Sequence, residues 1–242
     1  MGIREVTGTL YGIGLGPGDP ELLTLKAHRL IRSANVIAYP APDHGDSFAR
    51  SIAAGFIPAD ATEIPMIVPM RTERFPAQQV YAKAAGQIAG HLDDGRDVVV
   101  LCEGDPFFYG SFMYLFARLA ADYPVEVIPG VSSLAGCTSA MNRPLVARND
   151  VLTVLPGPLP DGDLTQRVLA SDSVAIMKVG RHLPRLRDLV RSLGLLDAAA
   201  YIERATLPNQ RTCPLADAPD TAPYFSMILI TKGGDPWLNP AR

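Results

Sequence analysis

The stretch Thr9-Leu10-Tyr11-Gly12-Ile13-Gly14-Leu15-Gly16-Pro17-Gly18-Asp19-Pro20 decides the fold class of this chain. A short apolar strand, a glycine-dense turn and a helix that starts near Asp19 are how α/β proteins bring backbone N–H groups close to a ligand. Pro17 departs from the dinucleotide-binding form of this turn, because proline lacks an N–H donor and has a fixed φ. We therefore expect a turn that holds its ligand mainly by shape and not by donors to phosphate.

The bulk composition is that of a globular protein. Of the 242 residues, 48% are hydrophobic and 19% are charged, which suits one large domain or two smaller domains with their own cores. The net charge of −3 argues against nucleic acid as a partner, although a small anion could still bind to local arginines. No apolar run is long enough to span a membrane, and no apolar signal core follows Arg4 and Glu5. We expect no membrane partner and a cytoplasmic protein.

Cysteine and histidine spacing predicts no metal centre. Cys102, Cys137 and Cys213 lie far apart and are expected to be reduced thiols, and the histidines share no metal-ligand spacing. The chain also lacks a P-loop, a GxSxG motif and an HExxH motif, which removes the commonest NTPase and hydrolase interpretations.

Strands and helices alternate along the chain. We expect strands at 10–13, 36–39, 63–67, 97–102 and 126–128, helices at 24–31, 47–54, 78–93 and 111–121, and a loop over 69–76. After Gly130 the pattern restarts, with helices at 132–141, 164–170 and 183–193 and strands at 151–155, 174–179, 199–203 and 225–231. The proline-rich segment 206–223 is expected to be loop, with at most an edge strand. This rhythm predicts two α/β domains, 1–127 and 128–242, with a mainly parallel sheet.

Three turns of similar kind each follow an expected strand. They are Gly14–Gly18, Glu103-Gly104-Asp105-Pro106 and Pro129-Gly130-Val131-Ser132-Ser133. Because ligands of open α/β sheets bind outside the carboxyl ends of the strands, all three turns can line one crevice. Asp105 can meet a ligand or can cap its own turn through an Asx interaction, and the pattern does not decide between these. One of the two serines can cap a helix, which leaves the other free for a ligand.

Basic residues are grouped around the loops. The pairs are Arg71 and Arg74, Arg143 and Arg148, and Lys178 and Arg181. Most such side chains are simply solvated. Arginine pairs beside a cleft can also bind carboxylates in bidentate fashion, so the sequence leaves a polyanionic substrate as one alternative.

The three turns together identify a family. The chain resembles the class III S-adenosylmethionine-dependent methyltransferases that act on tetrapyrroles, and the resemblance runs in the family's order over nearly the whole chain. Further matching segments are Pro20-Glu21-Leu22-Leu23-Thr24, Phe107-Phe108-Tyr109, Met177-Lys178-Val179-Gly180-Arg181, Glu203-Arg204-Ala205-Thr206 and Tyr224–Leu229. Within the family, the segments 39–40, 68–70, 177–181 and 224–227 most resemble the branch that methylates carbon 20 of precorrin-2, giving precorrin-3A on the way to vitamin B12.

The resemblance implies a fold and a set of site residues. It implies two α/β domains with a cofactor cleft between them, the first on the substrate side, the second carrying dimer contacts, and a homodimer as the assembly. Carried over residue by residue, the S-adenosylmethionine site comprises Pro17, Glu103, Gly104, Asp105, Phe108, Ser132, Ser133, Met177, Lys178, Val179, Ala205 and Thr206. The carboxylates of the tetrapyrrole would be bound by Arg71, Arg74, Arg143, Arg148 or Lys178.

One departure from the family affects the chemistry. Relatives on the sirohaem branch carry an aspartate after the tyrosine that matches Tyr39, whereas this chain has Pro40. The general base of that branch therefore has no counterpart at this position and cannot be assigned here by analogy. Candidates for the proton acceptor are Tyr39, Glu103 and Tyr109, with Asp105 or a tetrapyrrole nitrogen as further possibilities.

Several other functions stay open at this stage. A cobalt-containing precorrin-2, another corrin-ring substrate, or a protein or ribosomal RNA substrate would suit the same fold. A non-catalytic S-adenosylmethionine sensor would share the cofactor motifs. A nicotinamide dehydrogenase is disfavoured by Pro17 and by the missing acidic residue at the end of the second strand.

Overall fold

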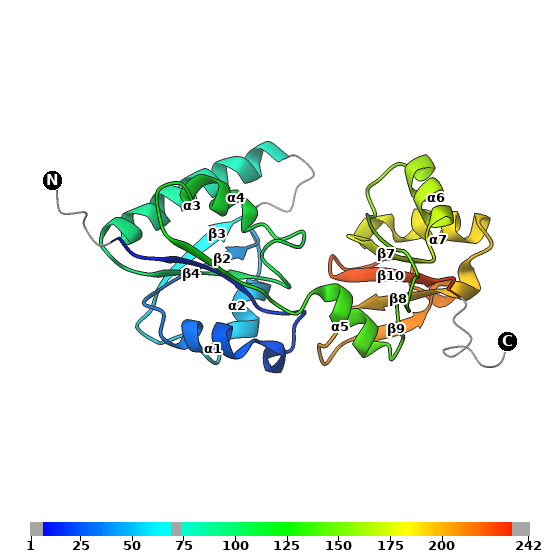
Figure 1. Ribbon diagram of the computed structural model, residues 1–242, viewed down its shortest axis with the longest axis horizontal. Coiled ribbons are helices and arrows are strands. Elements are labelled where there is room, and N and C mark those ends of the chain that lie inside the picture. The colour runs from blue at the N-terminus through cyan, green and yellow to red at the C-terminus, as the bar shows by residue number, and fades with distance from the viewer. Residues whose placement is uncertain (1–6, 69–73, 234–242) are drawn as a thin grey trace. The chain divides into compact units, whose positions relative to one another are not determined.

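The computed structural model describes residues 7–68 and 74–233, without the side chains of 74–77. The chain divides into two compact units, Met1–Ser132 and Ser133–Arg242, each built on its own sheet. The division falls a few residues beyond the boundary expected from the sequence. Figure 1 shows the two units, and each is described by itself below.

The first unit is built on a parallel sheet with the strand order β3-β2-β4-β1-β5. Its strands are β1 (Leu10–Gly14), β2 (Val36–Ala41), β3 (Thr62–Ile67), β4 (Val98–Cys102) and β5 (Val125–Ile128). The central strand β4 is buried along its whole length, as its unbroken apolar run predicts.

Helices cover both faces of this sheet (Figure 1). They are η1 (Pro20–Leu22), α1 (Leu25–Arg32), α2 (Phe48–Ala53), α3 (Arg74–Asp93) and α4 (Met113–Leu119). One core cluster joins the sheet to α3 and α4, and a second joins its other face to α1 and α2. Thr24 caps α1 as expected, since its hydroxyl accepts a hydrogen bond from the Ala27 N–H at 3.1 Å.

Two prolines lie inside strands without removing a ladder hydrogen bond. The sequence predicts that β2 ends before Pro40, but the strand continues to Ala41. The pairing of β2 with β4 stops at Ala38, so the missing N–H of Pro40 points to a side with no partner strand. Pro65 faces the free edge of β3 in the same way, which makes that edge a poor template for a further strand.

The second unit has a mixed sheet with the order β6-β7-β10-β8-β9. Its strands are β6 (Leu152–Pro156), β7 (Ser173–Met177), β8 (Ala199–Glu203), β9 (Arg211–Pro214) and β10 (Ser226–Thr231). Only β6 and β7 are parallel neighbours, because β10 inserts antiparallel between β7 and β8. The mainly parallel sheet predicted from the βα rhythm is therefore correct for the first unit and wrong for the second. The sequence predicts at most an edge strand within the segment 206–223, and β9 is that edge strand.

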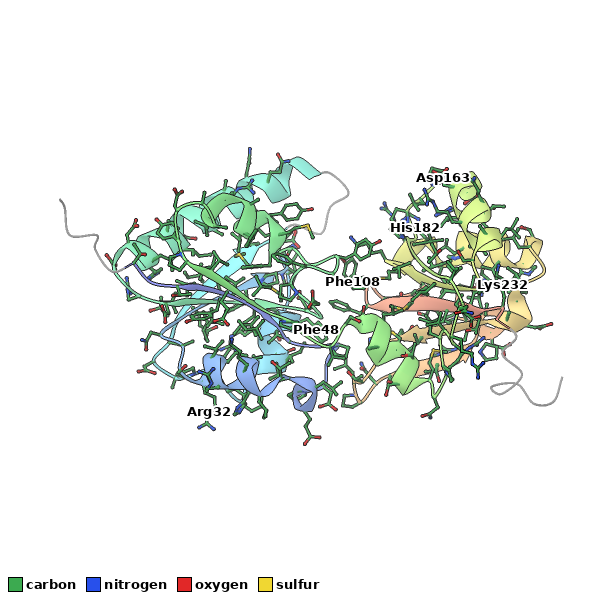
Figure 2. The ribbon with its side chains drawn as sticks, viewed as in Figure 1. Arg32, Phe48, Phe108, Asp163, His182 and Lys232 are labelled. Carbon is green, nitrogen blue, oxygen red and sulfur yellow. The ribbon has the colours of Figure 1, made fainter. Side chains whose placement is uncertain are left out.

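Helices also lie on both faces of the second sheet. They are α5 (Ser133–Ala140), α6 (Asp161–Ala170), η2 (Gly180–His182), α7 (Leu183–Ser192), η3 (Leu196–Ala198) and η4 (Leu215–Asp217). One cluster packs α6 and α7 against the sheet, and the other packs α5 against the opposite face. Lys232, labelled in Figure 2, donates to the carbonyl oxygens of Val168 and Leu169 at the end of α6.

The three glycine-marked turns meet backbone to backbone in the first unit. A Cβ on Gly130 would lie 2.0 Å from the carbonyl oxygen of Gly104, and a Cβ on Gly14 would lie 2.4 Å from the Gly130 nitrogen. Gly16 and Gly104 also exchange a pair of hydrogen bonds, at 3.1 and 2.8 Å. Backbones this close leave no room for any side chain at Gly14 or Gly130.

We expect Gly130→Ala to destabilise the protein by about 1–3 kcal/mol, because the new methyl group forces the Gly104 turn away. Gly86→Ala is the matched control: it lies in α3 with nothing within 4 Å and should stabilise by about 0.5–1 kcal/mol. Urea midpoints of both variants measure the difference. Equal midpoints would contradict the close contact.

Candidate functional site

Asp105 ties two of the turns in the first unit together. Its Oδ1 accepts hydrogen bonds from the N–H groups of Phe107 and Phe108, at 2.9 and 3.0 Å. Its Oδ2 accepts a third bond from the Gly130 N–H at 3.1 Å. The Asx interaction considered for Asp105 is thus present, and the same carboxylate links the turn after β4 to the turn after β5. Figure 2 shows the Phe108 side chain at the end of this unit where β4 finishes.

Two N–H donors of the glycine turn after β1 bond to the end of β4 and to the segment that follows it. The Leu15 N–H donates to the Cys102 carbonyl oxygen at 2.9 Å, and the Gly16 N–H donates to Gly104. The helix start expected near Asp19 is present but short: a single 3-10 turn, Pro20–Leu22, stands there, and Asp19 caps it by accepting from the Glu21 N–H. Half-buried Pro17 lies in this turn. With two donors engaged and no N–H on Pro17, the turn suits a ligand that is held by shape.

Glu103 lies directly after β4 in a half-buried position. Burial raises the pKa of its carboxyl group above the ordinary value of 4.5, while the backbone N–H groups of Glu103 and Ala49 act in the opposite direction. A carboxylate with a raised pKa is better suited to accept a proton near neutral pH than one in water. Of the three acid–base candidates, Glu103 has the environment that best fits a base.

Tyr39 is engaged in a network that includes an ion pair. Arg50 and Glu63 form a bidentate pair with distances of 2.6 and 2.8 Å. Burial raises the pKa of the Tyr39 phenol, and its hydrogen bond to Glu63 acts in the same direction. The Arg50 guanidinium holds the pKa of Glu63 down at about 2. A buried phenol with a raised pKa is a poor proton acceptor at neutral pH.

Tyr109 lies in a tight loop that exposes aromatic side chains. It has a φ of 57°, and 42% of its surface is exposed. A Cβ on Gly110 would lie 2.4 Å from the Pro106 carbonyl oxygen, so the loop closes tightly on itself. The Phe108 and Tyr109 rings contact each other edge to face, with centroids 5.4 Å apart.

In the second unit, the predicted cofactor residues meet at one end of the sheet. Met177 ends β7 and is followed by Lys178 and Val179. Ala205 and Thr206 come after β8, which is parallel to β7 across β10. Lys178 has a φ of 56° and Thr206 a φ of 71°. Left-handed backbone is rare for residues with a Cβ and rarest for a β-branched one, and such strain concentrates at functional sites.

The substrate arginines are not gathered at this end. Arg143 donates to the carbonyl oxygen of Ala198 at 2.6 Å and to the Thr231 hydroxyl at 3.2 Å, beside the amino end of β8. Arg148 lies in the connection that leads into β6, also on the amino side. A five-residue strand spans roughly 15 Å, so the structure separates both arginines from Lys178 instead of grouping them. Arg71 and the side chain of Arg74 lie outside the described residues.

The sequence did not single out Gln210, whose Oε1 accepts a hydrogen bond from the Thr206 N–H at 2.7 Å. Arg204, with a φ of 50°, and Ser226, which accepts from the Gly180 N–H at 3.4 Å, lie in segments that resemble the family but received no role of their own. No periodicity or motif marks the Gln210 contact, since it forms only when the turn closes. Among the described residues, no group of three His, Cys, Asp or Glu side chains could hold a metal ion, and Cys102, Cys137 and Cys213 are free thiols.

A family model for tetrapyrrole (corrin/porphyrin) methylases matches residues 9–219. The chain belongs to this family, which confirms the family inferred from the three turns and the later motifs.

Two curated relatives are similar over nearly the whole chain. Cobalamin biosynthesis protein CobIJ of Mycobacterium tuberculosis (strain ATCC 25618 / H37Rv) is 43% identical over 93% of this chain and 46% of its own length. The chain thus spans about half the length of that relative. Precorrin-2 C(20)-methyltransferase of a Sinorhizobium species is 44% identical over 92% of this chain and 95% of its own length.

Solved structures confirm the α/β fold class. Cobalt precorrin-4 methyltransferase, CbiF, superposes with a TM-score of 0.70 at 22% identity, covering 92% of this chain and 94% of its own, which shows the fold alone. Uroporphyrin-III C-methyltransferase of Thermus thermophilus, complexed with S-adenosyl homocysteine, has a TM-score of 0.66 at 26% identity, covering 92% of this chain and 97% of its own. Among the described residues, no helix combines the length and apolar character needed to cross a membrane.

We expect Asp105→Asn to destabilise the protein by about 1–3 kcal/mol. Both carboxylate oxygens of Asp105 accept hydrogen bonds from N–H groups, whereas the NH2 group of asparagine is a donor and would face at least one of those N–H groups. Thermal or urea unfolding measures the effect. Asp43→Asn, on an exposed loop, is the control and should leave the midpoint unchanged. A wild-type midpoint for Asp105→Asn would show that the carboxylate does not join the two turns.

The Arg50–Glu63 pair should make stability depend on pH in a definite window. The folded-state pKa of Glu63 is about 2, below its ordinary 4.5, so the pair's contribution is present above about pH 4.5 and is lost as pH falls towards 2. Glu63→Gln should therefore cost about 1 kcal/mol or less at pH 7, because both side chains still touch water.

The measurement for this pair is the difference in urea midpoint between wild type and Glu63→Gln from pH 7 down to pH 2.5. The difference should shrink at the acid end. Glu126→Gln, which breaks the more exposed pair with Lys26, is the control. A difference that stays constant across the range would contradict the assignment.

Proposed function

We propose that this chain transfers the methyl group of S-adenosylmethionine to carbon 20 of precorrin-2, giving precorrin-3A in cobalamin biosynthesis. The single observation that carries this proposal is the 44% identity to the Sinorhizobium precorrin-2 C(20)-methyltransferase, spread over nearly the full length of both chains. The cobalt-precorrin-2 enzyme of Salmonella typhimurium is 29% identical over a similar span, so the metal-free substrate is the better supported one.

The residues at the strand ends suit S-adenosylmethionine, which carries a sulfonium, an amino acid group and an adenine but no phosphate. The first unit offers the turn around Pro17, in which the Leu15 and Gly16 N–H groups are already engaged, and the half-buried residue Glu103 beside Gly104 and Asp105. The second unit offers Met177, Ala205 and Thr206, together with the backbone of Val179, whose own side chain is buried in the core against α6 and α7. We assign these residues, with Phe108, Ser132, Ser133 and Lys178, to the cofactor site.

S-adenosylmethionine supplies an electrophilic methyl group, so the protein has to align the two reactants and remove one proton. The electron pair of the methyl–sulfur bond stays on sulfur, the carbon at position 20 forms the new bond, and that carbon loses its hydrogen as a proton. Glu103 is the side chain proposed to accept this proton, because burial raises its pKa. Lys178, at the carboxyl end of β7, is proposed to bind a substrate carboxylate.

We further propose a cytoplasmic homodimer, as the family resemblance implies. The free thiols of the described residues suit a reducing compartment.

Incubation of the purified protein with methyl-labelled S-adenosylmethionine and either metal-free or cobalt-containing precorrin-2 tests the proposal. We expect one labelled methyl group in the tetrapyrrole by mass spectrometry, with the metal-free substrate turned over faster. Preference for the cobalt form would overturn the choice of substrate.

Binding of S-adenosyl homocysteine, measured by calorimetry, separates the remaining outcomes. Binding without methylation of either substrate would point to a sensor or to a different corrin ring. The Glu103→Gln variant is the control for chemistry: it should keep the fold and lose turnover by about 100-fold or more. Undiminished turnover in that variant would remove Glu103 as the base.

A further inference from the structure

The turn that follows β8 holds a strained backbone. Arg204 has a φ of 50° and Thr206 a φ of 71°, both in the left-handed region. For a β-branched residue such as Thr206 this conformation is a true outlier, and it persists only where the surrounding contacts impose it. The contacts that impose it here come from Glu203 and Gln210.

Glu203 holds the start of the turn. The residue is 8% exposed, and its carboxylate accepts hydrogen bonds from the Tyr201 hydroxyl at 2.5 Å and from the Arg204 guanidinium at 2.7 Å. The Arg204 N–H in turn donates to the Phe225 carbonyl oxygen at 2.9 Å. Side chain and backbone of Arg204 are therefore both fixed, which leaves the residue little freedom to leave the left-handed region.

Gln210 holds the far side of the turn. Its Oε1 accepts a hydrogen bond from the Thr206 N–H at 2.7 Å. The turn also closes through its own backbone, with the Leu207 N–H donating to Arg204 at 3.1 Å and the Gln210 N–H donating to Leu207 at 3.0 Å. Because Gln210 is exposed, its side chain is not needed to fill a core. Its one evident task is to hold the Thr206 N–H.

We propose that Glu203 and Gln210 are positioning residues of the S-adenosylmethionine site, which act by holding Arg204 and Thr206 in left-handed backbone and thereby fix the Ala205–Thr206 segment. The inference rests on the proposed function, since Ala205 and Thr206 are the residues assigned to the cofactor. Neither positioning residue has to touch the cofactor. A turn held in its binding conformation before the ligand arrives saves the cost of ordering it on binding, and so raises affinity.

The test uses Gln210, because an exposed side chain can be changed without emptying the core. Gln210→Met has a similar length but no acceptor oxygen, and it should weaken S-adenosyl homocysteine binding about tenfold, the value of one ordinary hydrogen bond. Gln210→Glu keeps the accepting oxygen and should restore affinity to within about twofold of wild type. Gln166→Met, on the exposed face of α6, is the matched control and should bind as wild type does.

Steady-state kinetics separate positioning from a general loss of structure. The KM for S-adenosylmethionine should rise in Gln210→Met, while kcat at saturating cofactor and the KM for the tetrapyrrole stay unchanged. Glu203→Gln should shift the same constant, because one amide cannot accept from both Tyr201 and Arg204 as the carboxylate does. Should Glu203→Gln fold poorly, the Gln210 pair of variants decides.

The two possible failures are distinguishable. A wild-type protein that binds and methylates, with Gln210→Met binding equally well, would overturn this inference and leave the proposed function intact. A wild-type protein that binds neither S-adenosylmethionine nor S-adenosyl homocysteine would overturn the proposed function together with it. A loss in Gln210→Met that Gln210→Glu fails to recover would also contradict positioning through the Thr206 hydrogen bond.

Discussion

The backbone contact between Gly14, Gly104 and Gly130 is the constraint on which the first unit depends. A Cβ at Gly130 would lie 2.0 Å from a carbonyl oxygen, so the three turns can meet only because these positions lack side chains. The Asp105 carboxylate then fixes the contact by accepting three N–H groups, two from its own loop and one from Gly130. The turns thereby become one rigid surface at the carboxyl ends of β1, β4 and β5.

The second unit reaches a similar result by different means. Its strand-end turns contain Lys178, Arg204 and Thr206 in left-handed backbone, where glycine would be the unstrained choice. In the turn after β8, hydrogen bonds to Glu203, Gln210 and Phe225 hold Arg204 and Thr206 in that conformation. Ordering a glycine costs backbone conformational entropy, whereas holding a residue with a Cβ in left-handed backbone costs strain energy. These positions therefore keep side chains, which the glycines of the first unit do not offer.

Most elements follow from local pattern. The strand predicted at 199–203 coincides with β8, and Thr24 caps α1, because a short apolar run and capping chemistry are properties of short segments. The longer strand β2 and the earlier start of α3 do not follow, since Pro40 and the residues after Arg74 are read locally as breaks. Pro40 is tolerated because its missing donor faces an unpaired side, and only the neighbouring strand reveals that. The separation of Arg143 from Lys178 likewise depends on the direction of strands that a local pattern does not contain.

By itself, the sequence determined the α/β class, the two sheets, the three turns and the family, because each of these depends on the order and spacing of glycines, prolines and apolar runs. Tertiary structure alone decided that β10 lies antiparallel between β7 and β8, that Asp105 accepts from Gly130, and that Gln210 holds Thr206. Asp105 and Gly130 lie 25 residues apart in the chain, and β10 joins strands from distant segments. Such contacts arise from the packing of the whole unit, whose close-packed interior admits one arrangement of its neighbours.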